Sequence, residues 1–162
     1  MPLSERLRSF LDSHQAEFTL STHPTAFTAR EVAAAEHMPP REVAKVVVIY
    51  GDAADYLVVI PANRQVDLHE VRSVLGLSQA RLAAESELVK LFPDCEVGAM
   101  PPLGALYGLP VYLDSTLANQ DTLAFNAGTH QDAIHMRMPE FRRLVSPQVV
   151  SVVREHAEAR GW

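Results

Sequence analysis

Two apolar runs, residues 43–50 and 56–61, place the strongest constraint on how this chain folds. Both runs are rich in β-branched and aromatic residues. Only five residues, Gly-Asp-Ala-Ala-Asp, lie between them, and this short connection predicts a β-hairpin. Strands joined by a hairpin are antiparallel, so the pair argues against a fully parallel, doubly wound sheet. We therefore expect a mixed, largely antiparallel α/β fold, either a curved sheet or a small barrel, flanked by helices.

Helical and extended patterns follow one another irregularly along the rest of the chain. Thr28 and Glu31 have the spacing of a capping box, Ser86 is a candidate helix cap, and Gly76 is a candidate helix stop. These signals and the apolar spacing predict helices over residues 4–14, 28–38, 66–75, 86–92, 140–145 and 147–159. Further strands are predicted over residues 18–22, 81–83, 110–113, 122–126 and 133–138.

The length of 162 residues fits one domain, and we expect a single domain over residues 1–162. The one cysteine, Cys95, excludes an internal disulfide framework and fits a reducing compartment, so the cytoplasm is the expected location. No apolar run is long enough to cross a membrane, and the first residues have the pattern of an amphipathic helix rather than of a signal peptide.

The formal net charge of −6 argues against a broad nucleic-acid surface, which needs a basic stripe to displace counterions. A small contact with the end of a nucleic acid is compatible with this charge. Arg30, Arg41, Lys45 and Arg64 would supply such a contact if the fold brings them together.

Lys45 directly precedes Val46 and the rest of a run that is typical of a buried strand. An unpaired buried ammonium is costly, so the side chain must reach water or an anion. Two interpretations remain open. The lysine can lay its stem along apolar surface and extend its head into water, or it can bind a phosphate or polarise a carbonyl oxygen.

Two segments far from Lys45 combine glycine with stiff or turn-forming residues. Residues 98–104 read Gly-Ala-Met-Pro-Pro-Leu-Gly, and residues 126–130 read Asn-Ala-Gly-Thr-His. Glycine permits close backbone approach and proline fixes the path, so the first segment is a candidate rigid pocket wall. His130, in the second, is a candidate acid, base or hydrogen-bond donor. Taken alone, each segment is equally compatible with an ordinary surface loop or turn.

Other kinds of catalytic site find no support in the sequence. The seven histidines show no metal-ligand spacing, and neither a Gly-x-Ser-x-Gly elbow nor a phosphate-binding loop is present. Cys95 lies between Asp94 and Glu96, whose negative charges would raise its pKa and weaken it as a nucleophile. We therefore expect no metal and no cofactor.

Taken together, the motifs resemble the YbaK/ProX family of aminoacyl-tRNA deacylases, which is related to the editing insertion of bacterial prolyl-tRNA synthetase. The resemblance rests on Lys45 before its valine run, on Gly98, Pro102 and Gly104 as a Gly-x-x-x-Pro-x-Gly pattern, and on the Asn-Ala-Gly turn at residues 126–128. It implies metal-independent hydrolysis of the ester that joins a wrong amino acid to the tRNA 3′ end.

The resemblance also implies roles for individual residues. Lys45 would hold the terminal adenosine phosphate or polar atoms of the substrate, and Gly98 would hold the aminoacyl group or the attacking water through its backbone. With His130 these form the candidate catalytic set. The candidate substrate-binding residues are Phe27, Val46, Met100, Pro102, Gly104, Asn126, Gly128 and Thr129.

The expected substrate is a mischarged tRNA with a small or weakly polar amino acid, and an aminoacyl-tRNA synthetase is an expected partner. The segments Ala99-Met100-Pro101 and Gly128-Thr129-His130 depart from the serine-containing or basic versions of some family members. The amino acid, the tRNA and the oligomeric state therefore stay open. Two other functions are compatible with the sequence: a non-catalytic module that binds an aminoacyl or nucleotide end, and a hydrolase of another small activated ester.

Overall fold

The computed structural model describes residues 4–154, whose strands form two sheets. The strands are β1 (Thr19–Thr22), β2 (Ala44–Gly51), β3 (Ala54–Pro61), β4 (Arg81–Leu82), β5 (Val111–Asp114), β6 (Thr122–Asn126), β7 (Asp132–Arg137) and β8 (Gln148–Val150). One sheet has the order β1-β7-β6 and the other β4-β2-β3-β5-β8. The predicted mixed α/β class is confirmed, but the sheets do not close into a barrel.

The predicted hairpin organises the larger sheet. β2 and β3 pair antiparallel from Ala44 opposite Pro61 to Gly51 opposite Ala54. The turn between them is only Asp52 and Ala53, at φ 51° and 67°. Positive φ at both positions is typical of the tight hairpin turn whose twist matches that of the strands. Beyond β3, the pairing with β5 and then of β5 with β8 is parallel, so this sheet is mixed.

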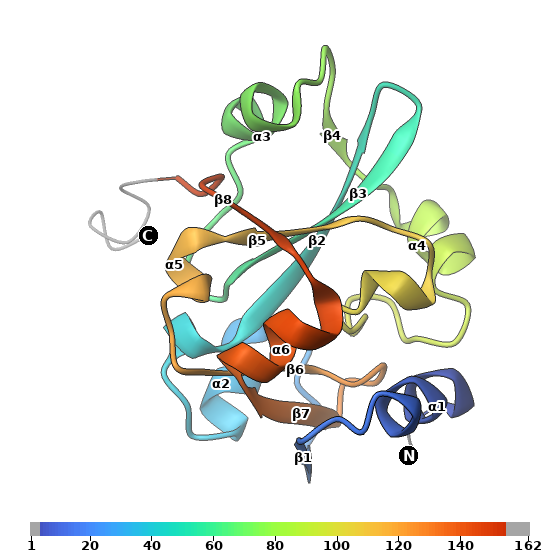
Figure 1. Cartoon of the computed structure of the whole chain (residues 1–162), viewed down its shortest axis with the longest axis vertical. Helices are drawn as coiled ribbons and strands as arrows, with labels where there is room; N and C mark the ends of the chain where they lie inside the picture. Colours follow the sequence, from blue (N-terminus) through green and yellow to red (C-terminus); the bar gives the residue numbers. More distant parts are fainter. Residues whose placement is uncertain (1–3, 155–162) are drawn as a thin grey trace.

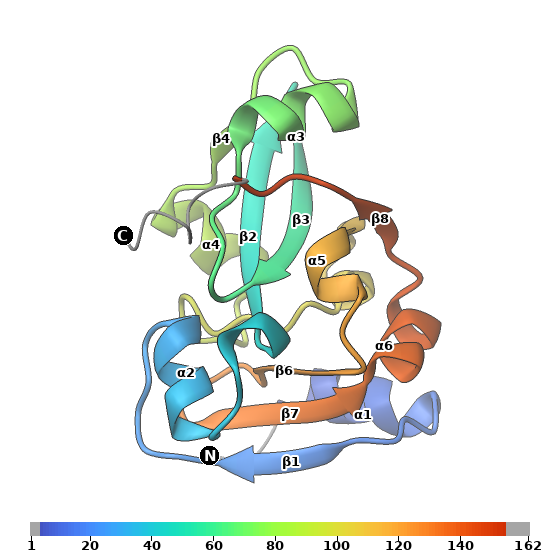
Figure 2. The same cartoon turned by 90° about the vertical axis from the view of Figure 1, so that its left-hand side faces the viewer.

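The smaller sheet is antiparallel and runs crosswise to the larger one, as Figure 2 shows. The two are joined where β2 begins, by a parallel bridge between Val43 and Ala124 of β6. Main-core residues come from both sheets, among them Leu57, Leu113, Phe125 and Ile134, all completely buried. The start of β2 therefore lies at the junction of the two sheets.

Helices surround the sheets (Figure 1). They are α1 (Glu5–Ser13), α2 (Ala29–Ala35), α3 (Leu68–Leu75), α4 (Glu85–Leu91), α5 (Ser115–Ala118) and α6 (Met138–Val145), with short 3₁₀ turns η1 (Pro40–Glu42) and η2 (Gly104–Leu106). The capping box of Thr28 and Glu31 on α2 is confirmed, as is the left-handed Gly76 that ends α3. The short helix α5 was not predicted.

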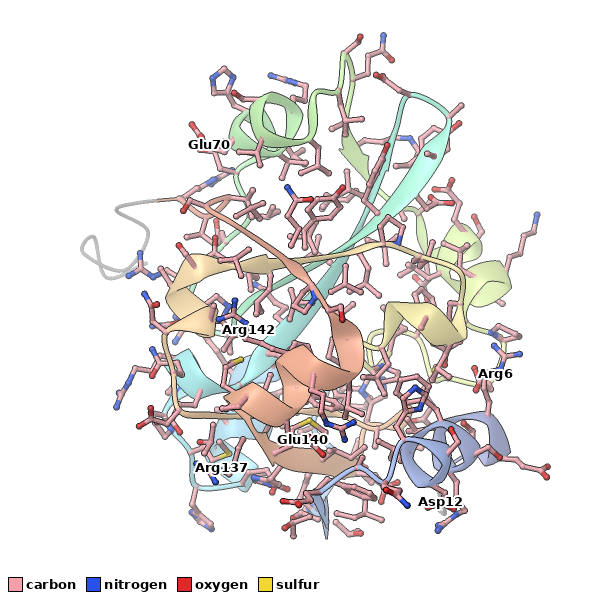
Figure 3. All side chains as sticks on the ribbon, viewed as in Figure 1. Arg6, Asp12, Glu70, Arg137, Glu140 and Arg142 are labelled. Atoms are coloured by element: carbon pink, nitrogen blue, oxygen red, sulfur yellow. The ribbon has the colours of Figure 1, made fainter. Side chains whose placement is uncertain are left out.

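Helix α1 is fixed to the rest of the molecule at both ends. Leu7 and Leu11, one turn apart, are each 1% exposed, which contributes about 1.5–3 kcal/mol per side chain. Arg6 reaches to the carbonyl oxygen of Leu106 at 3.4 Å (Figure 3). Glu140 on α6 accepts a hydrogen bond from the backbone N–H of Glu17, just after the helix. These contacts connect the N-terminal segment to η2 and to α6.

One predicted helix and one predicted helix cap are wrong. Residues 148–150 form β8 instead of a helix, because this valine-rich segment pairs with β5, with Val150 opposite Asp114. Residues 155–159 of the predicted helix lie outside the described residues. Ser86 lies inside α4 rather than capping it: the helix begins at Glu85, and Glu87 accepts the N–H of Ala84 at 2.6 Å.

Gly104, at the start of η2, is required by packing. A Cβ there would overlap the carbonyl oxygen of Leu109 and lie 2.6 Å from Cγ2 of Val111. We expect Gly104→Ala to lower the free energy of unfolding by about 3 kcal/mol, because backbone atoms cannot move aside easily. The matched control is Gly108→Ala, where φ is +68° but no atom lies within 4 Å, so that only about 1 kcal/mol is lost. Equal denaturant midpoints for the two variants would contradict this account.

Candidate functional site

A cavity of about 490 Å³ lies against the first half of β2. Among the described residues, β4 pairs with β2 only at Ile49 and Tyr50, and the N–H of Ala83 binds the carbonyl oxygen of Val48. Between Val48 and the bridge at Val43, this edge of β2 has no partner strand in the described chain. The cavity occupies that gap. Its walls are Lys45, Val46, Val47, Val48, Gln65, Val66, Leu68, Leu82, Ala83, Leu88, Met100 and Arg154.

Lys45 brings a positive charge into this mainly apolar cavity. Its side chain is half-buried, and no carboxylate within residues 4–154 forms an ion pair with it. Burial lowers the pKa of Lys45 from its usual 10.5, and the nearby charge of Arg30 lowers it further. A partly desolvated ammonium without a carboxylate partner is suited to an anionic or carbonyl oxygen of a ligand.

Met100 connects this cavity to the glycine loop. The buried Met100 lines the cavity, and its sulfur accepts the N–H of Gly98 at 3.2 Å. Gly98 itself is exposed and has φ +89°, a conformation that side-chain-bearing residues rarely adopt. Lys45 and the Gly98 loop, distant in sequence, thus lie on the same side of the molecule.

Hydrogen bonds hold the Gly98 loop against the turn after β6. The N–H of Gly128 binds the carbonyl oxygen of Ala99 at 2.9 Å, and the carbonyl oxygen of Gly128 accepts the N–H of Glu96 at 2.8 Å. The carboxylate of Glu96 in turn accepts the N–H of His130 at 2.6 Å. Gly128 has φ +96° and is buried, so it has a structural reason to be glycine. The two segments predicted from sequence form one unit.

His130 and Phe27 complete the outer side of this unit. His130 Nε2 lies 2.9 Å from the carbonyl oxygen of Val97, which can only accept, so a proton is assigned to this nitrogen. His130 Nδ1 is buried and has no hydrogen-bond partner within the described chain. The rings of His130 and Phe27 are 5.0 Å apart, and Phe27 is 68% exposed. Gly98, His130 and Phe27 are not among the described residues that line the cavity.

Four other predicted site residues lie deeper. Pro102 and Gly104 are buried and are not part of the cavity wall. Thr129 is also buried and donates to the carboxylate of Asp132 at 2.6 Å, which stabilises the turn. Asn126 ends β6, with its Oδ1 buried and unpartnered within residues 4–154. Their positions support the shape of the loop and turn.

The cavity's far wall was not predicted. Leu82, Ala83 and Leu88 come from β4 and α4, and Gln65 and Val66 from the connection after β3. Their side chains are ordinary, and no motif marks them. Only the pairing of β4 with the end of β2 brings them to the gap.

No group of three or more His, Cys, Asp or Glu within residues 4–154 is arranged to hold a metal ion. The histidines closest to an acid are His23 and His135, on either side of Glu36, whose side chain is 4% exposed. Burial tends to raise the pKa of Glu36, but hydrogen bonds from His135 and Ser21 outweigh it and the pKa is lowered. This cluster connects α2 to the smaller sheet.

Solved structures show which fold this is. A crystal structure of a candidate trans-editing enzyme for prolyl tRNA synthetase superposes with a TM-score of 0.82 over 95% of this chain and 100% of that one, at 24% identity. A second, of a hypothetical protein, gives 0.83 over 93% and 100%, at 20% identity. At these identities the likeness establishes the fold.

The profile of the aminoacyl-tRNA editing domain matches residues 23–144. The chain belongs to this family, as the motifs predicted. Two Escherichia coli relatives, from strains K12 and O157:H7, each bear the name multifunctional Ser/Thr-tRNA deacylase ProXp-y. Each is 27% identical over 155 residues, which cover 93% of this chain and 92% of the relative. The predicted class of enzyme, an aminoacyl-tRNA deacylase, is confirmed. No described helix is long and apolar enough to span a membrane.

Cys95, next to the loop, is expected to be a poor nucleophile. Burial raises its pKa to about 11; the hydrogen bond with Tyr107, at 3.2 Å, partly opposes this, and the charge of Asp94 adds to it. At pH 8 we expect alkylation by iodoacetamide about two orders of magnitude slower than in the unfolded chain, whose thiol has a pKa near 8.5. The rate should rise with pH up to about 11. Equal rates for folded and unfolded protein at pH 8 would contradict the assigned burial.

Proposed function

We propose that this chain is a trans-editing enzyme that hydrolyses the ester of a mischarged tRNA carrying a small amino acid. One observation carries the proposal: the half-buried ammonium of Lys45 and the side chain of Met100 from the glycine loop line the same cavity. Membership of the editing-domain family supports the type of reaction. The cavity would accommodate the aminoacyl end.

The cavity wall fits an aminoacyl group. Lys45 would contact the carbonyl oxygen of the ester or a polar atom of the terminal adenosine, and the valine, leucine and methionine side chains would surround the amino-acid side chain. Backbone groups of the Gly98 loop would orient the attacking water. Water adds to the carbonyl carbon, the bond to the ribose oxygen breaks, and that oxygen takes a proton, which yields free amino acid and tRNA.

An aminoacyl ester is already activated, so orienting water and stabilising the developing oxyanion can be sufficient. A vicinal ribose hydroxyl would assist. Apolar walls that admit a small side chain and exclude a larger one act as a second sieve after a synthetase. The Escherichia coli relatives are named for seryl and threonyl substrates, which are small and weakly polar. We propose the same size class here, with an aminoacyl-tRNA synthetase as a partner that supplies the charged tRNA.

Lys45→Ala should abolish most deacylation while the protein stays folded. Loss of a preorganised donor to a developing oxyanion typically costs about 10²–10³ in rate. The measurement is release of amino acid from a panel of mischarged tRNAs, with circular dichroism to confirm folding. Lys90→Ala is the matched control, because Lys90 is the only other lysine of the chain and is exposed on α4. Wild-type turnover by Lys45→Ala would remove Lys45 from the mechanism, and binding without turnover by the wild type would favour a non-catalytic module.

Gly98→Ala should also reduce the rate strongly. A Cβ at Gly98 would meet only the His130 ring, at an ordinary 3.5 Å, so the damage arises from the backbone: alanine at φ +89° is strained and would move the loop. We expect a loss of at least about tenfold in kcat/KM, since small displacements of positioning groups are costly. Gly76→Ala, with φ +69° and open space around it on α3, controls for strain alone. Full activity of Gly98→Ala would exclude the loop from the site.

A further inference from the structure

A second, strongly cationic pocket lies beside the start of β2. It has a volume of about 340 Å³ and is lined by three arginines, Arg30, Arg41 and Arg64, together with Pro40, Pro61, Asn63, Thr116 and Gln120. The arginines come from three places: α2, η1 and the connection after β3. The fold therefore brings together cations that are well separated in a chain of net charge −6.

The composition of this pocket points to an anionic ligand. Within residues 4–154, none of the lining residues is a carboxylate, and apart from two prolines the remaining wall is made of neutral hydrogen-bonding side chains. Arg41, whose side chain is 61% exposed, forms an ion pair with Glu42 at 3.8 Å. Guanidinium groups match phosphate oxygens in geometry and bind them in pairs.

The two pockets are neighbours. Pro61 and Arg64 line the arginine pocket, while the next residues, Gln65 and Val66, line the Lys45 cavity. Ala44, adjacent to Lys45, pairs with Pro61. Figure 2 shows α2 and the turn after it at the end of β2 where the strand begins. The short segment from Pro61 to Val66 therefore connects the arginine pocket to the cavity that we propose for the ester.

Like charges gather here at a cost to the folded protein. Burial lowers the pKa of Lys45, and the charge of Arg30 lowers it further, so these two cationic groups repel each other. A bound polyanion would relieve this repulsion. An RNA that placed its 3′ ester in the Lys45 cavity would carry its backbone phosphates past the cavity's rim, next to these arginines.

We propose that Arg30, Arg41 and Arg64 form a phosphate site for the RNA backbone that leads to the 3′ nucleotide. The assignment rests on the proposed function, because it places the ester of that nucleotide in the neighbouring cavity. The site supplies affinity without base contacts, so it would serve RNAs of different sequence equally.

The test is binding of a fluorescein-labelled, uncharged RNA hairpin that ends in single-stranded CCA, followed by anisotropy over a range of salt concentrations. Arg41→Gln and Arg64→Gln should each weaken binding severalfold. Each should reduce the slope of log affinity against log salt by about 0.7, the value for one lost contact to a single strand. Arg8→Gln is the control, since it makes the same charge change on the exposed face of α1.

Because the probe carries no ester, the result is independent of catalysis. A wild-type protein that binds the hairpin but hydrolyses no mischarged tRNA would contradict the proposed function and leave the phosphate site supported. Equal affinities and salt slopes for Arg41→Gln, Arg64→Gln and Arg8→Gln would overturn the site. Competition by AMP as effective as competition by the unlabelled hairpin would overturn its assignment to a polynucleotide. Arg41 is exposed, so its variant keeps the test valid if Arg64→Gln unfolds.

Discussion

The unpaired part of one strand edge determines where the cavity beside Lys45 forms. β2 belongs to the larger sheet, yet its first residue is preceded by Val43, which bridges to the smaller one. Since the two sheets run crosswise, a single neighbour cannot follow β2 along its whole edge, and β4 reaches only Ile49 and Tyr50. The gap that remains becomes the cavity, and Lys45 lies within it.

The loop that contributes Met100 to the cavity wall is held in place by a different kind of interaction. The Gly98 loop has no regular secondary structure, so its shape is set by hydrogen bonds to the turn after β6 and by two glycines at positive φ. Gly128 is one of them, and it exchanges two backbone hydrogen bonds with the loop. A binding wall built in this way is stiff without being part of a sheet. The side chain of His130 is tied to the same loop, since its Nε2 donates to the carbonyl oxygen of Val97 at 2.9 Å.

Sequence reasoning succeeded where the signal was local. The hairpin, the capping box at Thr28 and the left-handed Gly76 each depend on residues close together in the chain, and each is confirmed. It failed for residues 148–150, because a valine-rich segment becomes a strand only when a partner such as β5 offers an open edge. The cavity's far wall had no signal, since Leu82 and Leu88 reach the gap only through tertiary pairing. The motifs identified the family, the loop and three residues of the cavity wall, Lys45, Val46 and Met100, but not the other side chains that line the cavity.

The distribution of charge explains how an acidic protein can act on a polyanion. A surface of net charge −6 repels RNA at long range, so recognition must come from a few cations placed close to the reacting ester. In the proposed function, Lys45 would lie near the ester in a mainly apolar cavity, where its ammonium is partly desolvated and would act strongly on a carbonyl oxygen. Arg30, Arg41 and Arg64 line a separate, more polar pocket, where they would bind phosphate without entering the chemistry. Separating the two tasks allows phosphate affinity to be weakened by salt while the environment of the ester stays unchanged.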